Sequence, residues 1–431
     1  MKRCTPNGKR WYATGDTDGK KHVSAYQNAD PVLYAGLERG KYMCPMLIIF
    51  LAAMNVFMIL YAPQPLLPLF AEDFGVSIPT ASLTIAVTII ALAIASLLLA
   101  PAFDKWRRKK VMLFASIALI WPSVMLCITQ PFSMVLFWRI LYGLFIPGVT
   151  AVMMAYIAEE FPPEQRGRVM GVYVSANVAG GLLGRVISGP IAEAYSWQAV
   201  FGALALYSTL ISLLIWKLLS NSQHQPQRSE QSFLVHFRNP ALLGTFLIGF
   251  SQFFAFIGFF TYIPFYASTA PFQLTVTQIS LLYLTYAFGI LSAPIAGFLS
   301  DKIGRRTTMA AGHVIGAMGI LLTLWPSVPS LLIGSSLLTL GNFASQSAAT
   351  AYVTDVALES RGAATSLYLF FFYVGGSLGA WLPGFLWNDF GWRGLVVITV
   401  SMLVLALLSN ILLTKRHGQH HDPIRSSAPP S

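Results

Sequence analysis

The sequence predicts an all-α membrane protein with twelve transmembrane helices in two pseudo-symmetric six-helix halves. Three observations predict this class: the composition, the length of the apolar runs and an internal repeat. Of the 431 residues, 55% are hydrophobic and only 10% are charged, whereas a soluble globular domain carries about 25% charged residues. The apolar runs have roughly the 20 residues that an α-helix needs to cross a bilayer.

The positions of these runs predict the elements and the domain organisation. We expect an N-terminal tail at 1–43, a first half at 44–219, a linker at 220–239, a second half at 240–414 and a C-terminal tail at 415–431. The expected spans are 44–70, 80–100, 111–128, 134–158, 168–192, 198–219, 240–267, 277–298, 307–326, 330–354, 363–387 and 393–414.

The distribution of basic residues predicts the orientation. The chain has 28 Lys and Arg, 17 Asp and Glu, and a net charge of +11. If both termini are cytoplasmic, every basic residue except Arg139, Arg185 and Arg393 lies in or beside a cytoplasmic tail, linker or loop. This is the positive-inside pattern of membrane proteins. Because the basic residues are scattered through short segments, they do not indicate nucleic-acid binding.

The repeat relates the two halves of the chain. RGRVMGVYVSANVAGGLLGRVISG at 166–189 aligns without a gap with RGAATSLYLFFFYVGGSLGAWLPG at 361–384, and most of their glycines coincide. A parallel repeat of two six-helix halves is the organisation of one large class of secondary transporters. Arg185 stands opposite Ala380, so this arginine is an addition to one copy and is not required by the shared packing.

Three motifs carry a resemblance to a known family. GFLSDKIGRR at 297–306 closely resembles the cytoplasmic loop motif of the major facilitator superfamily, and FWRILYGLFIPG at 137–148 resembles its fourth-helix motif. YAPQPLLPLFAEDFGVS at 61–77 resembles the end of the first helix in a bacterial group described as sugar- or drug-efflux permeases. The resemblance covers all twelve spans.

This resemblance implies the major facilitator fold and a secondary active transporter that works by alternating access. It implies a proton-linked exporter of a small organic solute in the bacterial inner (plasma) membrane, with lipid as surroundings and a monomeric state. The alternative is an organic-anion carrier, a symporter or an exchanger, that uses Arg139 and Arg185. No span contains an acidic residue near its middle. Because no His, Asp or Glu cluster gathers at one depth, neither an enzyme nor a metal or other cofactor is predicted.

The loop motif and its relatives predict a gating function. The carboxylate of Asp301 and the guanidinium of Arg305 can form a charge-assisted bond that links two helix ends, and glycines permit a tight turn and close approach. We expect Glu159 to pair with Arg166 or Arg108, and Asp355 to pair with Arg361 or Arg305. The predicted gating residues are Asp104, Arg108, Glu159, Arg166, Gly297, Asp301, Gly304, Arg305, Asp355 and Arg361.

Three ionisable groups are expected deep in the membrane: Arg139, Arg185 and His313. Arginine rarely loses its proton, so neither arginine is expected to carry one. Three interpretations stay open for both arginines: the side chain snorkels to the outer interface, bonds to exposed backbone, or holds substrate or takes part in coupling. His313 is expected to be hydrogen-bonded within the protein or to lie beside lipid.

Polar residues near expected helix breaks and in a small-residue run predict the substrate site. The prolines that follow Tyr61 and Tyr262 are expected to break the first helix of each half, and a broken helix at depth must face protein or a water-filled cavity. The predicted substrate-binding residues are Tyr61, Gln64, Arg139, Arg185, Tyr262, Asn342 and Gln346.

Overall fold

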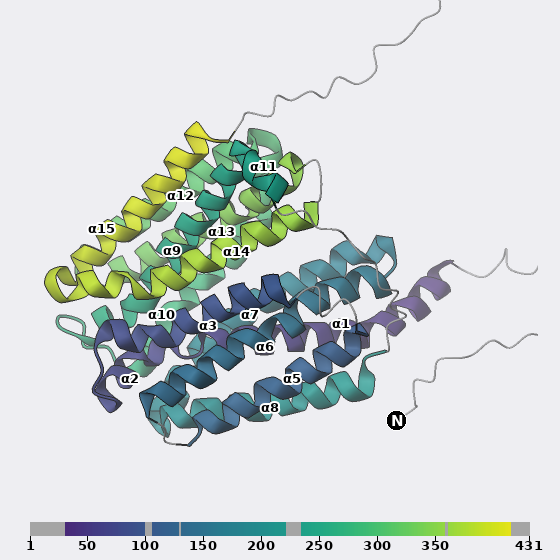
Figure 1. Ribbon diagram of the computed structural model, residues 1–431, viewed down its shortest axis with the longest axis horizontal. Helices are drawn as coiled ribbons and strands as arrows, with labels where there is room; N and C mark the ends of the chain where they lie inside the picture. The colour runs from purple at the N-terminus through teal and green to yellow at the C-terminus, as the bar shows by residue number, and fades with distance from the viewer. Residues whose placement is uncertain (1–30, 100–105, 129–130, 221–233, 358–360, 415–431) are drawn as a thin grey trace, which may run out of the picture. The chain divides into compact units, whose positions relative to one another are not determined.

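Long α-helices dominate the described residues, which contain no strand. The computed structural model describes residues 31–99, 106–128, 131–220, 234–357 and 361–414, with side chains from residue 43 onward. Residues from Pro45 onward form one compact unit. Its helices form the two predicted halves (Figure 1).

The first half contains α1 (Pro31–Tyr61), η1 (Gln64–Leu66), α2 (Leu67–Asp73), α3 (Ile78–Leu98), α5 (Arg108–Leu126), α6 (Phe132–Glu160), α7 (Pro163–Ala194) and α8 (Trp197–Leu218). The second half contains η2 (Leu234–Arg238), α9 (Pro240–Ser268), α10 (Val276–Leu282), η3 (Tyr283–Thr285), α11 (Tyr286–Ile303), α12 (Arg305–Leu322), α13 (Val328–Val356), α14 (Arg361–Trp381) and α15 (Pro383–Leu412).

Eleven helical segments of the described chain are long and apolar enough to cross a membrane. The predicted ninth span is α12, which is not among the eleven because its 18 residues begin with two arginines and two threonines. It packs between α13 and α15 as the twelfth long helix. The boundary expected between the last two spans, 363–387 and 393–414, coincides with a non-helical kink at Gly391 of α15, where φ is +56°. A one-residue turn at 382, which separates α14 from α15, was not expected.

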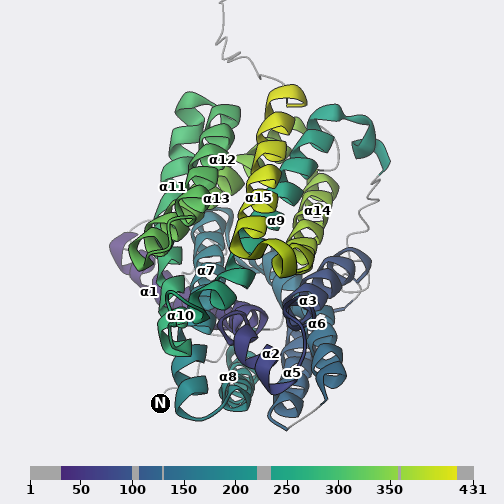
Figure 2. The ribbon, with the colours of Figure 1, turned by 90° about the vertical axis from the view of Figure 1, so that its left-hand side faces the viewer.

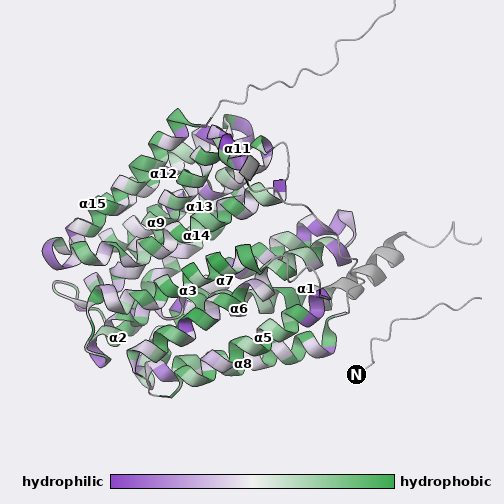
Figure 3. Cartoon of the chain, viewed as in Figure 1, coloured by the Kyte–Doolittle hydropathy of each residue, from purple (hydrophilic) through white to green (hydrophobic). Residues whose placement is uncertain are grey.

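Helix ends define the two ends of the unit. One end of the unit carries the turns at 74–77, 195–196 and 269–275, and we call it the distal end. The opposite end carries the turns at 161–162 and at Gly304, and we call it the proximal end. Hydrophilic residues gather largely at the helix ends and turns, and the helix bodies are mostly apolar (Figure 3). The two halves lie close at the distal end and their helices diverge toward the proximal end (Figure 1).

The same glycine packing occurs in both halves. A Cβ on Gly180 of α7 would collide with the backbone carbonyl of Met54 in α1. The repeat partner Gly375 of α14 meets the carbonyl of Phe250 in α9 in the same way. Small residues at such positions let membrane helices approach at backbone distance. The predicted pseudo-symmetry of the halves is therefore confirmed at the level of individual contacts.

The two prolines expected to break helices behave differently. After Tyr61 the chain breaks at Pro63 into η1 and α2, as expected. In contrast, α9 runs unbroken through Pro264, so the expected break after Tyr262 is wrong. Proline lacks the N–H that would bond to the carbonyl four residues earlier. That carbonyl, of Phe260, instead accepts a 2.7 Å hydrogen bond from the hydroxyl of Tyr283.

Candidate functional site

Arg139 of α6 binds the backbone at the broken end of α1. Its Nη1 and Nη2 donate to the carbonyls of Ile59 and Leu60 at 2.9 and 2.8 Å, and its Nε donates to the carbonyl of Thr84 at 2.9 Å. The side chain is 0% exposed. Pro63 cannot donate to Ile59, so the arginine replaces that helix bond. Snorkelling is therefore excluded for Arg139, and backbone bonding is its observed arrangement.

Arg185 of α7 lies in a cage of three tyrosines from both halves. Its guanidinium carbon is 3.9 Å from the ring centroid of Tyr61, 4.5 Å from that of Tyr286 and 5.3 Å from that of Tyr283. Guanidinium groups this close to aromatic faces are attracted by the ring quadrupole. We call Tyr61, Tyr283 and Tyr286 the tyrosine cage.

The hydrogen bonds of Arg185 leave one nitrogen without a partner. Nε donates to Oε1 of Gln64 at 2.6 Å, and Nη1 donates to the carbonyl of Gly181 at 2.6 Å. Nη2 is buried and bonds to no atom of the described residues. The side chain is buried and turned inward, so snorkelling is also wrong for Arg185. The two arginines share no hydrogen-bond partner, and Arg139, unlike Arg185, has a carbonyl partner for each of its three nitrogens.

Three hydrogen bonds between described residues join the halves toward the distal end. Gln64 Nε2 donates to Thr261 Oγ1 at 3.1 Å. The N–H of Thr277 donates to Glu193 Oε2 at 2.9 Å. The hydroxyl of Ser377 donates to the carbonyl of Ala86 at 2.9 Å. Figure 2 views this end, where α10 packs against α7.

Tyr262 lies apart from the tyrosine cage. Its hydroxyl donates to the carbonyl of Trp381 at 3.1 Å, and its ring stacks on Trp387 with centroids 5.7 Å apart. Although the sequence repeat pairs Tyr61 with Tyr262, only Tyr61 contacts the guanidinium of Arg185. The two predicted site tyrosines are therefore not brought together.

Asn342 belongs to a second polar cluster, between α9, α12 and α13. Gln252 Nε2 donates to the carbonyl oxygen and to Oδ1 of Asn342 at 2.8 and 3.1 Å. The hydroxyl of Ser345 bonds to Gln252 Oε1 at 3.0 Å and to His313 Nε2 at 2.9 Å. The expectation that His313 bonds within the protein is confirmed. Gln346 lies on the same helix with a half-buried side chain.

The predicted gating residues form one ion-pair group in each half. Arg108 Nη2 lies 2.9 Å from Glu159 Oε1 and joins α5 to α6. In the second half Arg305 Nε lies 3.3 Å from Asp355 Oδ2, joining α12 to α13, and Arg305 Nη1 lies 2.5 Å from Asp301 Oδ1. Each group therefore connects helices within one half.

The remaining predicted gating residues have other positions. Arg166 and Arg361 donate to the carbonyls of Phe161 and Ala357, and neither pairs with an acid of the described residues. Gly304 has φ +92°, as a tight turn requires. The close approach expected at Gly297 is not seen, since an added Cβ would lie 3.5 Å from the hydroxyl of Ser347. Asp104 lies outside the described residues.

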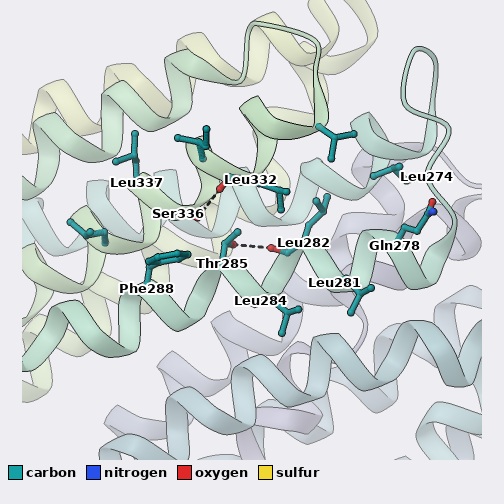
Figure 4. A pocket seen from close by; sticks show the side chains of 13 residues that line it. Leu274, Gln278, Leu281, Leu282, Leu284, Thr285, Phe288, Leu332, Ser336 and Leu337 are labelled. Atoms are coloured by element: carbon teal, nitrogen blue, oxygen red, sulfur yellow. Dashed lines mark hydrogen bonds between the residues drawn. The ribbon is translucent and has the colours of Figure 1, made fainter.

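An apolar groove lies elsewhere in the second half. It has a volume of about 860 Å³ and is lined by α10, α11 and α13, mainly by leucines such as Leu281 and Leu332 (Figure 4). None of the predicted substrate-binding residues lines it. Its apolar lining suits contact with lipid, whereas Gln64 and the tyrosine cage surround Arg185.

Several residues of these clusters are missing from the sequence predictions. Tyr283 and Tyr286 are three residues apart, a spacing that places two side chains on one helical face. This spacing was the sequence pattern that could have indicated the pair. Gln252 lies one residue before a phenylalanine run that favours packing. Its role depends on Asn342 in a helix distant in sequence, so no local pattern indicates it.

Comparison with known proteins identifies similar families and folds. The model of the Major Facilitator Superfamily matches residues 46–275 and 269–430. The inner membrane transport protein YnfM of Escherichia coli (strain K12) is 32% identical over 388 residues, with 88% of this chain and 93% of that protein covered.

Two further similarities are more distant. The purine ribonucleoside efflux pump NepI of Escherichia coli O127:H6 (strain E2348/69 / EPEC) is 22% identical over 353 residues, with 81% of this chain and 88% of that protein covered. The crystal structure of a D-xylose–proton symporter has a TM-score of 0.72 and 16% identity, with 86% of this chain and 98% of that chain covered. The similarity to the D-xylose–proton symporter concerns the fold alone.

Proposed function

Because the chain belongs to the major facilitator superfamily, we propose that it exports a small organic solute, linked to protons, by alternating access between its two halves. The contacts that join the halves at the distal end carry this proposal. Gln64 bonds to Thr261, and Arg185 of one half stacks on Tyr283 and Tyr286 of the other. These contacts can separate without disturbing the helix packing inside either half.

The proposed orientation follows from the basic residues. The termini and the linker are cytoplasmic by the positive-inside pattern, so the distal end faces outward and is closed in this structure. Export into the periplasm is supported by the similarity to NepI, which is named an efflux pump. The inner membrane of a bacterium is supported by the similarity to YnfM, which is named an inner membrane transport protein.

The substrate site that we propose is centred on Arg185 and the tyrosine cage. Both halves contribute to it, as a site that is exposed alternately to the two sides requires. Gln64 lies against the guanidinium of Arg185, and Asn177 Oδ1, also on α7, is buried and has no hydrogen bond to the described residues. These groups can hydrogen-bond a polar solute while the tyrosine rings contact its apolar parts.

The second candidate is an organic-anion carrier, and one observation favours it. Nη2 of Arg185 is a buried donor that bonds to none of the residues that the structure describes. Leaving such a donor unsatisfied costs about 1–3 kcal/mol, and more for a charged group. A carboxylate or phosphate oxygen would satisfy it with a charge-assisted bond. Arg139 is not available for this purpose because three backbone carbonyls already occupy its nitrogens.

Everted and right-side-out membrane vesicles test direction and coupling together. Vesicles with and without the overproduced protein would be incubated with a mixture of organic acids, sugars and nucleosides, and the contents measured by mass spectrometry. We expect protein-dependent accumulation in everted vesicles that a protonophore abolishes. Accumulation only in right-side-out vesicles would contradict export, and accumulation unaffected by the protonophore would contradict proton linkage.

A further inference from the structure

The buried cluster around His313 has a defined direction of hydrogen bonding. The backbone carbonyl of Asn342 can only accept, so the amide group of Gln252 that faces it must be the NH₂. Gln252 Oε1 then faces Ser345 and must accept, which makes the Ser345 hydroxyl the donor. The single hydroxyl proton of Ser345 is thereby used.

This direction fixes the tautomer of His313. Ser345 Oγ lies 2.9 Å from His313 Nε2 and has only lone pairs left to offer. Nε2 must therefore carry the proton, and Nδ1 of the neutral ring has a free lone pair. Nδ1 is buried and bonds to no atom of the described residues, and the side chain is 2% exposed. The ring thus presents an unused proton-accepting atom inside the second half.

No carboxylate among the described residues is placed to balance a charge on this ring. The elements packed against α12 are α13, α15 and α11. At the proximal end, Arg305 is paired with Asp301 and Asp355, and Arg306 donates to the carbonyl of Asn410. The other charged or titratable side chains of these helices have no hydrogen bond to His313: Lys302, Asp389 and Arg393 are exposed, and Tyr286 and Tyr352 are buried.

The cluster connects this ring to helices of the proposed transport path. Gly312, the neighbour of His313, packs so tightly on Gly341 and Ser345 that an added Cβ would collide with α13. The pair α12 and α13 is therefore held together. Ser345 and Asn342 then bond to Gln252 of α9, the helix whose Thr261 accepts the distal hydrogen bond from Gln64.

We propose that Nδ1 of His313 is the proton-binding site that couples protons to the alternating movement, an inference that rests on the proposed function. A proton from water binds the Nδ1 lone pair and gives an imidazolium, while Nε2–H stays on Ser345; release returns the neutral ring. A buried imidazolium without an anion is unfavourable. Binding of a proton therefore favours an arrangement of the helices in which water reaches Nδ1. The structure, which is closed at the distal end, corresponds to the protein with His313 in its proton-free form.

Distance measurements between spin labels test this without a known substrate. Labels would be placed at Glu164 of α7 and Lys302 of α11, both exposed at the proximal end, in a chain whose cysteines Cys4, Cys44 and Cys127 are replaced by serine. Acidification from about pH 8 to about pH 5 spans the titration of a histidine. On acidification, we expect the fraction of molecules with the shorter distance between the two labels to increase by about tenfold relative to the fraction with the longer distance.

The matched variants are His313→Gln and His236→Gln. Glutamine at 313 keeps an N–H that can donate to Ser345 but cannot be protonated, so we expect a folded protein whose two populations are independent of pH. His236, a buried histidine of η2, serves as the control, and its variant should respond as the wild type does. Gel filtration and circular dichroism check that both variants fold.

A pH response of His313→Gln equal to that of the wild type would overturn the proposal, as would a wild type whose distances do not change with pH. Neither result affects the proposed alternating access, because the vesicle assay measures transport directly. Conversely, a protein that moves with pH but exports nothing would contradict the proposed function and leave the proton site standing.

Discussion

Gln64 and Thr261 join the two halves of the chain through a buried hydrogen bond of 3.1 Å. The orientation of the glutamine amide is determined by Arg185, which can only donate, so Oε1 faces the arginine and Nε2 faces the threonine. Arg185, Gln64 and Thr261 thus form one continuous chain of bonds from α7 to α9. A change at the guanidinium is transmitted directly to the contact between the halves.

Replacing Thr261 by valine should weaken distal closure. Valine has a similar shape but no acceptor. A typical hydrogen bond contributes about 0.5–1.5 kcal/mol, which corresponds to about a two- to twelvefold change in the ratio of closed to open molecules. The measurement is the reaction rate of a cysteine at Ser280, which is buried at this end, with a membrane-impermeant maleimide. The rate should rise in Thr261→Val.

Thr245→Val is the matched control for that experiment. Thr245 is also buried on α9, but its hydroxyl donates only to the carbonyl of Ala241 within the same helix. Its replacement should leave the labelling rate unchanged. Equal rates in Thr261→Val and the wild type would mean that the bond does not hold the distal end closed.

Arg139 should be required for folding. Its removal leaves the carbonyls of Ile59 and Leu60 without donors inside a membrane-spanning unit, at a cost of about 1–3 kcal/mol for each unsatisfied group. We expect Arg139→Met to abolish a monodisperse peak in gel filtration. Arg139→Lys should be only slightly better because one ammonium cannot reproduce the planar fork of donors. A well-folded Arg139→Met protein would refute this role.

The glycine contacts can be tested as two matched pairs. Gly180→Ala and Gly375→Ala should each lower Tm, since an added Cβ meets the backbone of the facing helix, and overpacking costs about 1–3 kcal/mol. Gly171→Ala and Gly362→Ala, in the same two helices but with no atom within 4 Å of an added Cβ, should not lower Tm. Equal effects within a pair would disprove the packing argument.

The two ion-pair groups should contribute unequally to stability. The side chain of Arg108 is 7% exposed and that of Arg305 is 27% exposed. Exposed pairs contribute about 0–1 kcal/mol, whereas buried or partly buried pairs are screened much less by solvent and salt. Glu159→Gln should therefore lower Tm more than Asp355→Asn, as measured by thermal unfolding in detergent. The reverse order would contradict the burial argument.

The fold was largely predictable because its main signals are local. Twenty-residue apolar runs, the positive-inside bias and an ungapped repeat each report directly on membrane helices. The ninth span was the least distinct, because Arg305, Arg306 and three glycines reduce its apolar character. The break expected near 390 is the kink at Gly391. The additional turn at 382 was missed because apolar residues continue on both sides of it, although Pro383 marks the start of the next helix.

The site was only partly predictable because its contacts join distant segments. Arg185 was identified as unusual by its mismatch with Ala380, but the cage needs Tyr283 and Tyr286 from the other half. Arg139 was likewise a charged residue inside an apolar run, and its three carbonyl partners distinguish it from Arg185. The unbroken course of α9 through Pro264 depends on the hydroxyl of Tyr283, a partner that no local pattern identifies.

The central claim is that Arg185 and the tyrosine cage bind the transported solute. The most direct measurement compares ligand-induced changes in Tm of purified wild type, Arg185→Lys and Arg185→Gln across anionic, neutral and cationic organic compounds. We predict that at least one compound raises the Tm of the wild type, raises that of Arg185→Lys only weakly, and leaves that of Arg185→Gln unchanged. Both variants should still unfold cooperatively without ligand. Equal stabilisation of all three proteins by the same compound would contradict the claim.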